Sequence, residues 1–93
     1  MDKLTEARHK IEDIDKEMAK LFIKRMGCSE MIAEYKSANG IPILDTGREN
    51  ELIKRNEGYI ENERLQPFYN DFMKSVLNIS KQYQHKLMED MRI

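Results

Sequence analysis

The feature that most constrains the fold of this chain is its N-terminal stretch, which lacks strong helix breakers. Residues 2–38 contain no proline and only one glycine, Gly27, and are rich in residues that favour helices. Apolar residues recur every seven positions in two rows, which is typical of one long helix that packs against other helices. The rows are Leu4, Ile11, Met18, position 25 and Ile32, and Ala7, Ile14, Leu21, Cys28 and Tyr35. The pattern predicts a helix over about residues 2–38, with Asp2 as its N-cap.

A helix of this length has a consequence for assembly. At 1.5 Å per residue it would be about 55 Å long, whereas a compact domain of this size has a radius of gyration of only about 13 Å. The remaining residues are too few to cover both ends of its apolar face. We therefore expect an obligate oligomer, most simply a two-fold homodimer.

The rest of the chain predicts two further helices. Asn39 and Gly40 fit a helix C-terminus, and the segment before Pro42 is disfavoured in helical conformation. A second, short helix is expected over about residues 46–57, capped either by Asp45 or by a Thr46–Glu49 capping box. A third is expected over about residues 66–91, with Pro67 in its first turn. The expected fold is all-α, with long, short and long helices in a single free-standing domain over residues 1–93.

Composition excludes several classes of function. The net charge of −1 provides no general attraction for nucleic acid or an anionic membrane. No apolar run is long enough to span a bilayer, and no signal peptide is recognisable, so a cytoplasmic protein is expected. Cys28 is the only cysteine, and His9 and His85 lack further metal ligands nearby. We expect no metal site, no cofactor, no nucleic-acid partner and no membrane partner.

Polar residues at positions where the periodicity expects apolar ones indicate a site. Arg25 interrupts the first apolar row, and Lys36 and Arg8 directly follow residues of the second row. On the third helix, Ser80 and Gln84 lie one turn apart on one face. On the second helix Arg48 lies four residues before Leu52, with Glu49 beside it. Cations outnumber the inward carboxylates, for which Asp15 and Glu49 are the candidates, so a pocket for an anion is predicted.

Each of these residues also has a simpler structural interpretation. An arginine beside an apolar row often extends its charged end into solvent or forms a structural ion pair. Ser80 and Gln84 can be ordinary polar contacts of a helical bundle, and Cys28 is best interpreted as a small core residue. The residues alone thus predict a helical dimer with a cationic internal pocket, and they do not identify its ligand.

Taken together, three segments resemble the all-helical chorismate mutase family. The first is Arg8-x-x-Ile11-x-x-Ile14-Asp15, followed by Arg25 and by Ile32-x-x-Tyr35-Lys36. The second runs from Gly40 through Ile41-Pro42-Ile43-Leu44 to Asp45-Thr46-Gly47-Arg48-Glu49, and the third is Ser80-x-x-x-Gln84. The resemblance covers nearly the whole chain in the same order. It implies an intertwined helical-bundle homodimer and the rearrangement of chorismate to prephenate, in phenylalanine and tyrosine biosynthesis, without a cofactor or a covalent intermediate.

The resemblance also implies roles for individual residues. Arg25, together with Arg8 donated by the second chain, would bind the two carboxylates of chorismate, with Arg48 and Ser80 helping around the pocket. Lys36 and Gln84 would hydrogen-bond the ether oxygen. Glu49 and the backbone N–H of Asp45 would bind the ring hydroxyl. Two alternatives remain open at this point: an isochorismate pyruvate-lyase on the same fold, and a non-catalytic helical dimerisation module.

Overall fold

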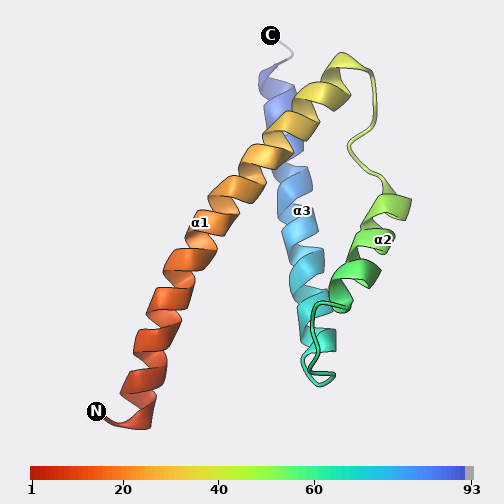
Figure 1. Cartoon of the computed structure of the whole chain (residues 1–93). Helices are drawn as coiled ribbons and strands as arrows, with labels where there is room; N and C mark the ends of the chain where they lie inside the picture. The colour runs from red at the N-terminus through yellow and green to blue at the C-terminus, as the bar shows by residue number, and fades with distance from the viewer. Residues whose placement is uncertain (92–93) are drawn as a thin grey trace.

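The computed structural model describes residues 1–91, which form an elongated arrangement of three helices measuring 55 × 28 × 14 Å. The helices are α1 (Lys3–Ala38), α2 (Thr46–Glu57) and α3 (Gln66–Asp90). No strand occurs among the residues described. The predicted all-helical architecture and its long, short, long order are confirmed. Figure 1 shows α3 between the other two helices, with the N-terminal half of α1 extending away from both.

Local sequence explains where the first two helices begin. The Asp2 carboxylate caps α1 by accepting hydrogen bonds from the Thr5 backbone N–H at 2.8 Å and from the Thr5 hydroxyl at 3.1 Å. These contacts stabilise the charged form and lower the pKa of Asp2. At α2, the side chain of Asp45 is the N-cap and accepts from the Arg48 backbone N–H at 3.0 Å. Of the two caps considered for this helix, Asp45 is therefore the one observed.

The ends and links are also determined locally. Beyond the end of α1, Gly40 has a φ of +63°, a conformation that side chains with a Cβ rarely adopt. The Ile41 backbone N–H then donates to the Lys36 carbonyl at 2.9 Å, which turns the chain towards α2. Pro67 lies in the first turn of α3. The Gln66 side chain donates to the Ile60 carbonyl at 2.9 Å and ties the link between α2 and α3 to the start of α3.

Packing centres on α3. It contacts both α1 and α2, whereas α1 and α2 do not pack on each other within the described part of the chain. The apolar core is small and consists of Ala33, Ile43 and Met73. The Tyr83 hydroxyl of α3 donates to the Glu30 carboxylate of α1, and this contact raises the pKa of Tyr83. α3 thus holds the other two helices together.

The N-terminal half of α1 is left without a packing partner. Every residue from Glu6 to Lys24 is exposed in the single chain. These residues include large apolar side chains that the heptad pattern assigns to a packed face, among them Ile14 at 55% exposure and Leu21 at 61%. An exposed apolar row of this length is characteristic of a surface that binds another protein.

Candidate active site

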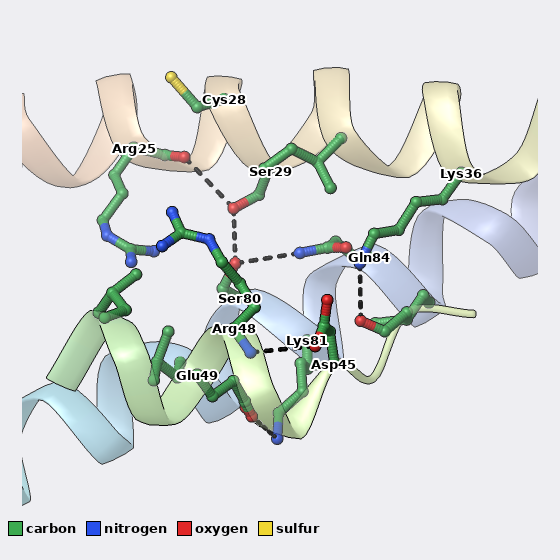
Figure 2. Close-up of a pocket in the computed structure, with 14 residues that line it drawn as sticks. Arg25, Cys28, Ser29, Lys36, Asp45, Arg48, Glu49, Ser80, Lys81 and Gln84 are labelled. Atoms are coloured by element: carbon green, nitrogen blue, oxygen red, sulfur yellow. Dashed lines mark hydrogen bonds and ion pairs between the residues drawn. The ribbon is translucent and has the colours of Figure 1, made fainter. Parts of the chain in front are cut away.

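A cavity of about 300 Å³ lies between the C-terminal half of α1, the start of α2 and the middle of α3. Figure 2 shows side chains from all three helices pointing into it. Its lining residues are Arg25, Cys28, Ser29, Ile32, Lys36, Ile43, Asp45, Arg48, Glu49, Leu52, Leu77, Ser80, Lys81 and Gln84. All of the site residues predicted from the sequence except Arg8 are in this set.

The residues from α1 lie on one stripe of the helix. Arg25, Ser29, Ile32 and Lys36 are spaced by four, three and four residues, so all of them face the same side. Lys36 is held in place because its ammonium group donates to the Ile43 carbonyl of the connecting segment at 2.9 Å. The helix therefore presents two cationic groups to the cavity, one at each end of this stripe of residues.

Three cations of the cavity, Arg25, Lys36 and Arg48, have no carboxylate partner among residues 1–91. Arg25 and Lys36 are half-buried, and Arg48 reaches the cavity from the first turn of α2. Among residues 1–91, none of the three forms an ion pair. Partly buried cationic groups without counter-ions are unfavourable in an empty pocket and favour binding of an anionic ligand. Two guanidinium groups can each bind a carboxylate through two hydrogen bonds.

The carboxylates that line the cavity already have other partners. Asp45 accepts the capping hydrogen bond from the Arg48 backbone, so its side chain belongs to the start of α2. One oxygen of Glu49, Oε1, contacts the Lys81 ammonium group at 2.8 Å. The other oxygen, Oε2, is buried and has no hydrogen-bond partner among residues 1–91. The cavity thus keeps its positive character even though two acidic residues border it.

A chain of hydrogen bonds connects α1 to Gln84. The Ser29 hydroxyl donates to the Arg25 carbonyl at 3.3 Å and lies 2.6 Å from the Ser80 hydroxyl. Either hydroxyl can donate in this bond, and the Ser80 hydroxyl also accepts from the Gln84 side-chain N–H at 3.3 Å. All three side chains are buried, with at most 6% exposure. These contacts connect Ser29 of α1 to the amide nitrogen of Gln84 on α3 through Ser80.

The structure adds Ser29 and Lys81 to the residues expected from the sequence. Ser29 could have been found, because it lies one turn after Arg25 on the stripe that ends at Lys36. Lys81 resembles an ordinary surface lysine, and only the three-dimensional contact with Glu49 reveals it. Cys28 also borders the cavity. The sequence indicated that it is a core residue, but its side chain is exposed in the single chain.

Arg8 is the predicted site residue that this chain does not bring to the cavity. It lies on the exposed N-terminal half of α1, more than four helical turns before Arg25. Within residues 1–91 there is also no group of three or more His, Cys, Asp or Glu side chains arranged to bind a metal ion. None of the helices over the same residues is long and apolar enough to cross a membrane.

Comparison with known proteins agrees with this geometry. The family model described as chorismate mutase type II matches residues 7–85. A curated protein from Methanocaldococcus jannaschii named chorismate mutase is 40% identical over 55 residues, which is 59% of this chain and 56% of that relative. The match thus spans little more than half the length of the relative. No solved structure matches the chain significantly.

The buried serine pair provides a test of the hydrogen-bond chain. Replacing Ser29 by alanine removes a hydrogen-bond partner of the buried Ser80 hydroxyl, so Ser29→Ala is expected to lower the free energy of unfolding by about 1–2 kcal/mol. Urea denaturation at a fixed protein concentration measures this change. Ser37→Ala, at an exposed position of the same helix, serves as the control and is expected to change stability by less than about 0.5 kcal/mol. Equal effects of the two substitutions would contradict the proposed chain.

Proposed function

This chain belongs to the chorismate mutase type II family, and we propose that it catalyses the intramolecular Claisen rearrangement of chorismate to prephenate. Prephenate leads to phenylalanine and tyrosine, so the proposed role is in their biosynthesis. The observation that carries the proposal is a set of three cations that line one cavity without carboxylate partners in the described part of the chain: Arg25, Lys36 and Arg48. Chorismate has two carboxylates, an ether oxygen and a ring hydroxyl, and the cavity offers a group suited to each.

The proposed binding mode assigns these groups as follows. Arg25 binds one carboxylate, and Arg8 of a second copy of the chain binds the other, with Arg48 and Ser80 beside them. Glu49 and the backbone N–H of Asp45 bind the ring hydroxyl. Holding both carboxylates keeps the flexible side chain of chorismate in the compact shape from which the new carbon–carbon bond forms. Part of the rate enhancement is then a reduction in the entropy lost at the transition state.

Lys36 and Gln84 act on the bond that breaks. Cleavage of the ether C–O bond increases negative charge on the oxygen in the transition state. An ammonium group and an amide N–H directed at this oxygen stabilise the transition state more than the bound substrate. The N–H of Gln84 that is not bonded to Ser80 remains available for this role. The rearrangement needs no nucleophile, no general acid and no general base.

We further propose that the working form is an intertwined homodimer. The apolar residues between Glu6 and Lys24 are exposed in the single chain, and a second copy running antiparallel along α1 would cover them. The same arrangement would carry Arg8 of one chain to the cavity of the other. Each of the two cavities would then consist mainly of one chain, with a single cation added by its partner.

The first test is direct conversion of chorismate. Wild-type protein is expected to consume chorismate and form prephenate, which absorbance and product analysis measure. Lys36→Ala is expected to lower kcat by roughly 10²- to 10³-fold, because it removes one charged group at the breaking bond, while the protein stays folded and dimeric. Wild-type protein that leaves chorismate unchanged but forms pyruvate from isochorismate would identify a lyase. Failure with both substrates would favour a non-catalytic dimerisation module.

The donation of Arg8 between chains can be tested by mixing two inactive variants. Arg8→Ala and Lys36→Ala are each expected to have little activity as homodimers. After equal amounts are unfolded together and refolded, a mixed dimer has one cavity with neither change. Random assortment should therefore restore roughly a quarter of the wild-type specific activity. If Arg8 served the cavity of its own chain, every cavity in the mixture would contain one change, and activity would stay low.

The amide at position 84 predicts the pH dependence. A glutamine donates its hydrogen bond at any ordinary pH, whereas a glutamic acid can donate only when protonated. Wild-type kcat is therefore expected to stay nearly constant from about pH 5 to about pH 8, while Gln84→Glu should lose kcat as the pH rises above the usual range of a glutamic acid. Stopped assays over this range measure both profiles. A wild-type kcat that falls steeply above pH 5 would contradict the role of Gln84.

A further inference from the structure

The contact between Lys81 and Glu49 joins two helices at the edge of the cavity. Lys81 belongs to α3 and Glu49 to the first turn of α2, and the two charged groups are 2.8 Å apart. Their side chains are only 27% and 20% exposed, so solvent screens this pair less than the surface pairs of the chain. In Figure 2 the Glu49 carboxylate is turned towards Lys81.

Other cationic residues line the same cavity as Glu49. Glu49 follows directly after Arg48, and Arg25 and Lys36 line the cavity as well. Guanidinium groups without counter-ions attract any nearby mobile carboxylate. A Glu49 side chain that paired with one of them would occupy a group that the proposed substrate needs. The Lys81 contact removes this competition because it supplies a separate cation for Glu49.

The second oxygen of Glu49 has a different status. Oε2 is buried and has no hydrogen-bond partner among the described residues. A buried carboxylate oxygen without a donor is unfavourable, so it is suited to accept a hydrogen bond from a ligand. Because Oε1 pairs with Lys81, the ion pair determines the orientation of the carboxylate and so the direction in which Oε2 points.

We propose that Lys81 is a positioning residue for the substrate site. It holds Glu49 through Oε1, which keeps the carboxylate away from Arg25 and Arg48 and leaves Oε2 as the acceptor for the ring hydroxyl of chorismate. This inference rests on the proposed function, and it concerns a residue that acts through Glu49 without touching the substrate. Its main effect is on substrate affinity, since Glu49 is assigned to the ring hydroxyl and not to the ether oxygen on which charge develops.

The test combines substitutions of Lys81 with one at Glu49. Lys81→Ala is expected to raise KM for chorismate about five-fold, which is the order expected when one charge-assisted contact is misplaced. Calorimetry should show a rise of the same size in Kd for prephenate. The change in kcat should be smaller. Lys81→Arg, which retains the cation, is expected to restore most of the affinity. Lys86→Ala is the matched control, because Lys86 also lies on α3 but pairs at 3.9 Å with Asp90 on the surface.

The double variant separates positioning from a general effect of charge. In a Glu49→Gln background no carboxylate remains for Lys81 to hold, so adding Lys81→Ala should change KM no further. A similar rise in KM in both backgrounds would overturn the proposal, since it would mean that Lys81 contributes only its charge. A Lys81→Ala variant that behaves like Lys86→Ala would overturn it too.

These outcomes differ from a failure of the proposed function. If wild-type protein neither converts chorismate nor binds prephenate, the proposed function is wrong, and the role of Lys81 is wrong with it. If wild-type protein is active and Lys81→Ala shows no change in KM, only the role of Lys81 is rejected. Activity in the wild type with a KM effect that depends on Glu49 supports both.

Discussion

Arg25 and Arg48 approach one cavity from two different helices, and neither is neutralised by a carboxylate of the described chain. This unbalanced charge depends on the packing of α3 against both α1 and α2, which brings the two helices to the same space although they do not contact each other. The fold therefore has to tolerate a pocket that is electrostatically unfavourable when empty. A dianionic ligand offsets that cost when it binds.

The other polar groups of the cavity are held in place by contacts that do not involve the side chains of Arg25 and Arg48. Asp45 is engaged by the start of α2, Glu49 by Lys81, and Lys36 by the Ile43 carbonyl. Ser80 bonds to Ser29 and to the amide nitrogen of Gln84. Such preorganisation matters for the proposed rearrangement, which has no chemical intermediate, because the protein can accelerate it only by placing charges and restricting conformations.

The sequence was informative wherever a polar residue interrupted a regular apolar row. Arg25, Ser80 and Gln84 were identified in this way, and the structure places them in one cavity. Ser29 was missed, although its position one turn after Arg25 on the stripe that ends at Lys36 could have identified it. Lys81 was missed because its significance depends on Glu49, which is 32 positions away in the chain. Arg8 shows the opposite situation, since its proposed site exists only when two chains combine. The three-helix order followed from proline, glycine and capping residues, whereas the packing of α3 between α1 and α2 depends on tertiary contacts.

The uninterrupted length of α1 has a consequence for how this protein can change during evolution. In the proposed dimer Arg8 and Arg25 lie about 25 Å apart along one rigid helix, and they serve two different cavities. The length of the helix between them therefore determines where each arginine lies. Inserting or deleting a single residue between them would rotate one arginine by about 100° relative to the other and would impair both cavities at once. The link between α2 and α3 carries no such constraint and can vary in length. Insertions and deletions should therefore be tolerated in that link and excluded from the part of α1 between Arg8 and Arg25.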